Sequence, residues 1–161
     1  MTFKRFEDIE GWKLARQLCK RVRDITEREP FAKDWTLRNQ IKASSGSTMD
    51  CIAEGFERGS TNEFVYFLGV SKGSCGESRS QLYRAFDHHY IDQQELDELL
   101  SLAFRINAAA QGLIEYLNKT EIKGTRSHGK DEKKKDEKKK KKSYIGGESD
   151  RYFPNSPPPG I

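Results

Sequence analysis

The sequence has little cysteine, the residue that cross-links small proteins and holds structural zinc in them. Its 161 residues include only three cysteines, Cys19, Cys51 and Cys75, an odd number with no CxxC pair. Cysteines spaced this widely argue against a disulfide framework and against a zinc site. Cys75 lies among small residues in GSCGES but keeps the phase of an apolar helical stripe, so we expect a buried thiol rather than a nucleophile.

Long apolar runs are also missing. No stretch approaches the roughly 20 apolar residues that a membrane-spanning helix needs, and the N-terminal MTFKRFEDIE lacks the apolar region of a signal peptide. We therefore expect a soluble, cytoplasmic protein. Hydrophobic residues make up only 34% of the chain and charged residues another 34%, so part of it is expected to be unfolded or solvated.

The charge is distributed unevenly, which divides the chain into two predicted regions. Residues 1–122 carry 17 Lys plus Arg and 19 Asp plus Glu, a net charge of −2. Residues 123–161 carry 12 basic and 6 acidic residues, a net charge of +6. One folded domain fits the first region, because single domains typically have roughly 100 to 150 residues.

The second region is low in complexity, with lysine runs at Lys133–Lys135 and Lys138–Lys142 and then glycines and prolines. It has too little apolar surface to offset the entropy of ordering it, so we predict a disordered tail. Two interpretations of the lysines remain open. They bind nucleic acid or another polyanion through its phosphates, or they solvate an extension without a function of its own.

The first region contains four segments in which apolar residues recur at steps of three and four, the spacing of one helical face. They run from Phe6 to about Arg28, from Asp34 to Gly55, from Ser60 to His89 and from Asp92 to Leu117. Short connections and the lack of a strand pattern predict an all-α fold, an antiparallel up-and-down four-helix bundle with a disordered C-terminal tail.

Polar residues mark the predicted helix starts. Asp34 is placed to cap the second helix, and capping boxes are expected at Ser60–Glu63 and Asp92–Glu95. Glycine lowers helix stability by up to about 1 kcal/mol, so several glycines of the middle region are expected at helix ends or close crossings. These glycines are Gly55, Gly59, Gly69, Gly73 and Gly76.

Catalytic patterns are not apparent. His88 and His89 are adjacent, so on a helix their side chains point about 100° apart and do not face one ligand. The segment GVSKGSCG lacks the residue order of a phosphate-binding loop, and the glutamates lack the Glu-x-x-His pattern of di-iron bundles. We predict a protein that is not an enzyme and that has no cofactor or metal.

A row of cations on the first helix gives a stronger signal. Lys13, Arg16, Lys20 and Arg23 recur at steps of three and four, on a face turned away from the apolar stripe. Such a stripe suits a phosphate backbone. The alternative is an ordinary solvated face whose charges pair locally, as the i, i+4 spacing of Arg23 and Glu27 allows.

Several motifs together resemble a known family. FEDIEGWKLARQLCKRVRDIT is followed by an Ala-Glu-Gly motif with an arginine three residues later, a Phe-Leu pair, a Gly-Ser pair and a leucine-rich last helix. The motif residues to which we assign structural roles are Ile52, Ala53, Glu54, Gly55, Phe67, Leu68, Gly73, Ser74 and Glu77. Over roughly residues 6–118 the chain resembles the four-helix bundle proteins encoded in 23S rRNA intervening sequences. That family also includes the accessory variability determinants of diversity-generating retroelements.

The resemblance implies a non-enzymatic homopentamer. In the retroelement branch it implies binding to RNA or DNA and association with a reverse transcriptase. Arg38, Lys42 and Arg58 then join the stripe as nucleic-acid-binding candidates. The alternative is a structural protein-interaction module with no nucleic-acid role.

A closed ring of five needs two different faces of each copy in contact. Aromatic residues outside the single core stripe are candidates for these faces, although ordinary core use explains each of them equally well. They are Trp12, Trp35, Phe56, Tyr66 and Tyr83.

Overall fold

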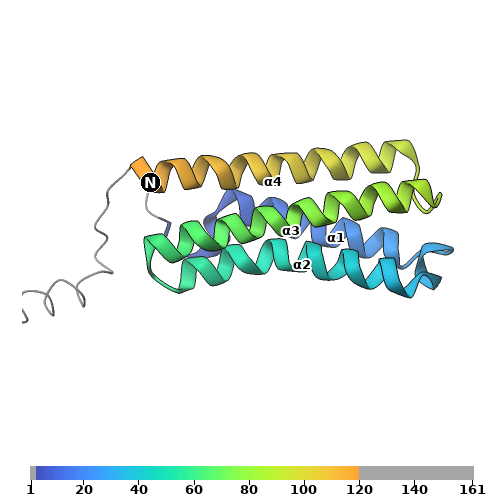
Figure 1. Ribbon diagram of the computed structural model, residues 1–161, viewed down its shortest axis with the longest axis horizontal. Coiled ribbons are helices and arrows are strands. Elements are labelled where there is room, and N and C mark those ends of the chain that lie inside the picture. Colours follow the sequence, from blue (N-terminus) through green and yellow to red (C-terminus); the bar gives the residue numbers. More distant parts are fainter. Residues whose placement is uncertain (1–2, 120–161) are drawn as a thin grey trace, which may run out of the picture. The chain divides into compact units, whose positions relative to one another are not determined.

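Four long helices make up the fold, shown in Figure 1 for a computed structural model that describes residues 3–119. The helices are α1 at Glu10–Thr26, α2 at Trp35–Glu57, α3 at Thr61–Asp87 and α4 at Gln93–Lys119. Two 3-10 turns, η1 at Phe6–Asp8 and η2 at Phe31–Lys33, precede α1 and α2. The described residues contain no strand, which confirms the predicted all-α class.

Each helix packs against two others in an up-and-down arrangement. α1 contacts α2 and α4, and α3 contacts the same two helices. The α1–α2 and α3–α4 connections lie at one end of the bundle and the α2–α3 connection at the other, so neighbouring helices run antiparallel (Figure 1). Among residues 3–119, every helix is too short or too polar to span a lipid bilayer.

The four helices together form one compact unit. The predicted low-complexity tail, residues 123–161, lies outside the described residues.

Two of the three predicted helix starts have the expected hydrogen bonds. The Leu37 amide donates to Asp34 Oδ1 at 2.9 Å, which caps α2. At α4, the Glu95 amide donates to Asp92 Oδ1 at 2.9 Å and the Asp92 amide to Glu95 Oε2 at 3.3 Å, a complete capping box. At α3 the box is not formed, because Ser60 makes no side-chain cap bond. The Glu63 carboxylate instead lies 3.4 Å from Arg58.

The prediction for the first helix was too long at its N-terminus. Phe6 belongs to η1, and Ile9 is extended, with φ −76° and ψ 123°, before α1 begins at Glu10. Apolar spacing alone does not show this break, because both Phe6 and Ile9 still pack on the bundle. They join a cluster with Ile52, Phe56 and Leu68 at the end of the bundle that holds the α2–α3 connection.

A layer of hydroxyl groups lies between α2 and α3. Ser44 and Ser78 are buried and their Oγ atoms lie 2.7 Å apart, while buried Ser71 donates to the Thr48 carbonyl at 2.6 Å. These bonds explain how α2 tolerates polar residues in its core-facing stripe, since a buried hydroxyl is costly only when it lacks a partner.

The glycines behave in two ways. Gly59 has φ 73° in the α2–α3 connection and so marks a helix end. A Cβ on Gly55 would lie 2.5 Å from Phe67 Cβ, so Gly55 lies at a close crossing of α2 and α3. Gly69, Gly73 and Gly76 lie at neither kind of position, because an added Cβ there meets nothing within 4 Å. These three lie within α3 and are not needed for packing in a single copy.

Candidate nucleic-acid interface

The four cations predicted on the first helix lie exposed along the outer side of α1. The apolar residues that alternate with them along α1 are buried, namely Leu14, Ala15, Leu18 and Val22. The burial pattern therefore directs Lys13, Arg16, Lys20 and Arg23 to solvent. Lys13, Arg16 and Lys20 make no ion pair with any residue in the range 3–119.

Helix α2 adds two of the predicted cations beside this row. Glu27 Oε1 lies 3.2 Å from Arg23 Nε and 3.7 Å from Lys42 Nζ, so one carboxylate holds cations from both helices. Arg38 lies one helical turn before Lys42 and shares its side of α2. We call the set Lys13, Arg16, Lys20, Arg23, Arg38 and Lys42 the basic face.

Tryptophan rings lie beside two of these cations. The Arg38 guanidinium lies 5.0 Å from the centroid of the Trp35 ring, and that of Arg16 lies 5.7 Å from the Trp12 ring. Trp35 is 67% exposed, the highest value among the large hydrophobic residues described. An exposed aromatic ring next to a cation offers a nucleobase a stacking partner close to a phosphate ligand.

Arg38 is fixed by the connection before α2. Its Nη1 donates to the Ala32 carbonyl at 3.1 Å, while its Nε is buried without a hydrogen-bond partner in the described part of the chain. The charge pattern along α1 did not reveal that Trp35 lies beside the cations. The i, i+3 spacing of Trp35 and Arg38 was the available signal, since residues three apart are neighbours on a helix.

The thiol of Cys19 lies between α1 and α2, where its Sγ donates to the Ser45 carbonyl at 3.0 Å. Burial raises the pKa of Cys19, the hydrogen bond to Ser45 opposes this, and the negative charge of Asp50 adds to it. Glu27, which lies within ion-pair distance of Arg23 and Lys42, offsets part of the charge of the basic face.

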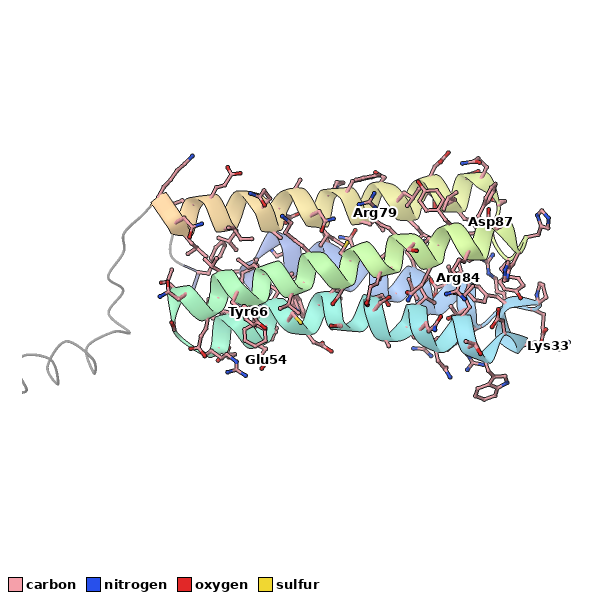
Figure 2. The ribbon with its side chains drawn as sticks, in the orientation of Figure 1. Lys33, Glu54, Tyr66, Arg79, Arg84 and Asp87 are labelled. Atoms are coloured by element: carbon pink, nitrogen blue, oxygen red, sulfur yellow. The ribbon has the colours of Figure 1, made fainter. Side chains whose placement is uncertain are left out.

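Arg58 does not join the basic face. Its Nε lies 3.1 Å from Glu54 Oε1 and its Nη1 lies 3.4 Å from Glu63 Oε1, while its guanidinium lies 4.7 Å from the Phe67 ring centroid. Two carboxylates balance its charge, and one of them, Glu54, is labelled near the end of α2 in Figure 2. In this arrangement Arg58 fastens α2 to α3.

Most of the motif residues also hold α2 against α3. Ile52 and Leu68 are fully buried, Gly55 allows the close approach of Phe67, and Ser74 Oγ lies 2.9 Å from Ser47 Oγ. Ala53 and Phe67 are half-buried, Glu54 pairs with Arg58, and Gly73 is exposed. Glu77 is exposed on the wall of a polar groove between α2 and α3, about 510 Å³ in volume, which Gln40, Gln81 and Arg84 also line.

Of the proposed interface aromatics, Trp35, Tyr66 and Tyr83 are exposed and Trp12 is half-buried. Phe56 is only 8% exposed and packs edge-to-face on Phe64 at 5.9 Å, so it serves the core. Cys75 is fully buried, as predicted, and burial raises its pKa to about 11. His88 and His89 are exposed.

The fold and this surface define a small antiparallel four-helix bundle with a basic face on its first two helices. The model of the 23S rRNA-intervening sequence protein family matches residues 7–112, and the chain belongs to this family. No curated protein matches it.

One solved structure that resembles the bundle is a protein of unknown function from the S23 ribosomal protein family of Bacteroides thetaiotaomicron. It has 17% identity and a TM-score of 0.61, and the alignment covers 65% of this chain and 95% of that one. At this identity the likeness supports the fold alone.

Proposed function

We propose that this protein is a non-enzymatic, self-assembling helical bundle that binds nucleic acid through its basic face. The observation that carries the proposal is the exposed row of Lys13, Arg16 and Lys20, which form no ion pair within residues 3–119. Unpaired cations at helical spacing neutralise phosphates and release counterions, and this release drives binding without sequence preference.

Trp35 and Arg38 supply the second element of the proposed site. A ring that is 67% exposed and lies against a guanidinium stacks on an unpaired base more readily than on a base inside a duplex. We therefore propose single-stranded RNA or DNA as the preferred class of ligand.

The assembly and the protein partner rest on the family resemblance. It supports a homopentamer, and in the retroelement branch it supports an accessory role beside a reverse transcriptase. A gene for a reverse transcriptase next to this one, with a template and variable repeat pair, favours that role. A position inside a 23S rRNA gene favours the other branch of the family.

A structural protein-interaction module remains the second candidate. The exposed aromatic side chains on α2 and α3 favour it, because large exposed apolar groups commonly mark protein contacts. A protein partner that stays bound to the chain after nuclease treatment supports this candidate.

The test is direct binding of a labelled single-stranded RNA of random sequence, followed by fluorescence anisotropy at low salt. We expect the intact chain to bind and the variant Lys13→Glu, Arg16→Glu, Lys20→Glu to lose at least about tenfold in affinity, because three phosphate contacts become repulsive.

The matched control changes the same number of charges elsewhere, as Lys4→Glu, Lys33→Glu, Arg105→Glu. These three residues are exposed and lie outside the basic face. Equal losses in both variants indicate a response to net charge alone and contradict the assigned face. An intact chain that does not bind at low salt rejects the nucleic-acid proposal.

A further inference from the structure

The polar groove between α2 and α3 is large enough to hold a small ligand. Its volume of about 510 Å³ lies within the range of about 300–1,000 Å³ that is typical of ligand sites. Helix α3 lines it with Glu77, Gln81 and Arg84, and α2 lines it with Gln40 and Ser47. These side chains carry carboxylate, amide, guanidinium and hydroxyl groups, so the groove offers both donors and acceptors of hydrogen bonds.

A buried hydroxyl group fixes the amide of Gln81 in this groove. Ser44 is only 4% exposed, and its Oγ donates to Gln81 Oε1 at 2.6 Å. Ser44 Oγ also lies 2.7 Å from Ser78 Oγ, so the hydroxyl group is itself held between α2 and α3. The amide oxygen of Gln81 is thus bound to the core of the bundle. Its Nε2, which makes no hydrogen bond within residues 3–119, is left to donate to a ligand.

The carboxylate of Glu77 lies beside this donor. Glu77 is exposed and makes neither an ion pair nor a hydrogen bond within residues 3–119. It lies one helical turn before Gln81, so the Cβ atoms of the two residues are about 5–6 Å apart on the groove side of α3. A carboxylate accepts hydrogen bonds through two oxygens and donates none. The pair therefore presents one donor next to two acceptors.

This order of groups matches the Watson–Crick edge of guanine. Guanine has a carbonyl oxygen, O6, followed by two neighbouring donors, N1–H and the N2 amino group. O6 accepts from Gln81 Nε2 while both donors face the carboxylate of Glu77. In adenine and cytosine a ring nitrogen that only accepts replaces the N1–H donor, and uracil has a single N–H between two carbonyl groups. Each of these three bases therefore sets an acceptor against a carboxylate oxygen, which is repulsive.

Arg84 adds a positive charge at one end of the groove. Its Nη1 donates to Gln40 Oε1 at 2.9 Å, and its guanidinium has no carboxylate partner within residues 3–119. Arg84 lies one turn beyond Gln81 on α3, and Figure 2 labels it between α3 and α2. Guanidinium groups bind phosphate oxygens through paired hydrogen bonds, so Arg84 is placed to bind a phosphate next to the base.

We propose that this groove selects guanine in the single strand that the basic face binds. Gln81 and Glu77 bind the base, and Arg84 binds the adjacent phosphate. This selection rests on the proposed function, because the basic face supplies affinity for any strand and the groove adds a preference for one base.

The basic face and the groove lie on two sides of the same helix. α2 contributes Lys42 to the basic face and Gln40 to the groove. The side of α2 between them carries Ala43, which is exposed, and Gly46, where an added Cβ meets nothing within 4 Å. An α-helix with its side chains is about 10–12 Å across, so an extended strand crosses α2 within a few nucleotides.

The experiment measures fluorescence anisotropy of two short oligouridine RNAs with the full chain at low salt. One RNA has a single guanosine at its centre, and the other has uridine there. The guanosine should raise the affinity at least about fivefold, because a well-placed pair of hydrogen bonds to a base discriminates by at least this factor. Adenosine or cytidine at the same position should give no gain. Inosine, which keeps O6 and N1–H but lacks the N2 amino group, should give only part of it.

Glu77→Gln is the test variant, and Glu57→Gln is its matched control. Glu57 is exposed on α2 outside the groove, and both changes remove one negative charge. The effect of net charge therefore cancels in the ratio of the two affinities. An amide at position 77 sets an N–H donor against a guanine donor, so Glu77→Gln should lose most of the preference for guanosine. The control should keep it.

Three outcomes separate the groove from the basic face. Equal affinities for the two RNAs in the unchanged chain overturn selection by the groove and leave the proposed function in place. A preference that survives in Glu77→Gln also overturns selection by the groove. The variant Lys13→Glu, Arg16→Glu, Lys20→Glu should lower both affinities by a similar factor, and a preference lost there assigns the selection to the basic face instead.

An unchanged chain that binds neither RNA rejects the proposed function, and the groove is then tested alone. Guanosine monophosphate is titrated into the full chain while NMR follows the side-chain amide signals of Gln40 and Gln81. Shifts of these signals that are absent with uridine monophosphate support the groove as a site for guanine in a free nucleotide. Unshifted signals overturn the groove as well.

Discussion

Replacing Gly55 with alanine tests the packing of α2 against α3. A Cβ at this position lies 2.5 Å from Phe67 Cβ and 3.2 Å from Phe64 Cδ2. The first of these atoms is attached directly to the α3 backbone, so a side-chain rotation does not relieve the contact and the two helices have to separate. Overpacking of this kind costs about 1–3 kcal/mol, whereas the gain in helix propensity is about 1 kcal/mol.

Gly46→Ala supplies the control for the same chemical change. Gly46 lies on the same helix, and its added Cβ meets nothing within 4 Å, so only the propensity gain remains. We expect Gly55→Ala to be less stable than Gly46→Ala by about 1–3 kcal/mol, since propensity cancels between them. Urea unfolding followed by circular dichroism measures both free energies. Equal stability in the two variants refutes the close crossing at Gly55.

Three further predictions concern caps, a thiol and the lysine runs. Asp34→Ala should lower the free energy of unfolding by about 1 kcal/mol, because it removes the side-chain cap on the Leu37 amide. Ser60→Ala should have little effect, because Ser60 makes no cap bond. Thermal melts compare the two variants. Burial raises the pKa of Cys75 from 9.0 to about 11, so the folded state binds this proton more tightly than the unfolded state does. The free energy of unfolding should therefore fall between about pH 9 and pH 11, and it should fall less steeply in Cys75→Ala than in the unchanged chain. Urea midpoints across this pH range show the difference, and parallel curves for the two proteins contradict it. A variant of the full chain with glutamine at Lys133–Lys135 and Lys138–Lys142 should keep most of its RNA affinity if the basic face is the main site. Fluorescence anisotropy measures this affinity. Complete loss of binding assigns it to the lysine runs instead.

The helices were predictable where apolar spacing and local capping agree. α4 combines a regular leucine stripe with the Asp92–Glu95 box, and both appear in the structure. The N-terminal break at Ile9 was not predictable, because Phe6 and Ile9 remain in contact with the core on both sides of it. The predicted capping box at Ser60 is not formed, and Glu63 pairs with Arg58 instead, a contact that the local pattern does not include.

The basic face was predicted only in part. Periodicity along one helix placed Lys13, Arg16, Lys20 and Arg23 together, because a helix determines its own faces. The periodicity of the first helix gave no information on which side of α2 lies beside these cations. The ion pair between Glu27 and Lys42 and the position of Arg58 outside the basic face depend on how the helices pack. For the same reason the open surroundings of Gly69, Gly73 and Gly76 became apparent only in three dimensions.

The salt dependence of RNA binding tests the central claim most directly. Each phosphate contact to a single strand contributes about 0.7 to the slope of log affinity against log salt concentration. Replacing Lys13, Arg16 and Lys20 with glutamine should therefore reduce the slope by about 2, while the same exchange at Lys4, Lys33 and Arg105 should leave it unchanged. An equal slope for the intact chain and the basic-face variant contradicts binding through this face.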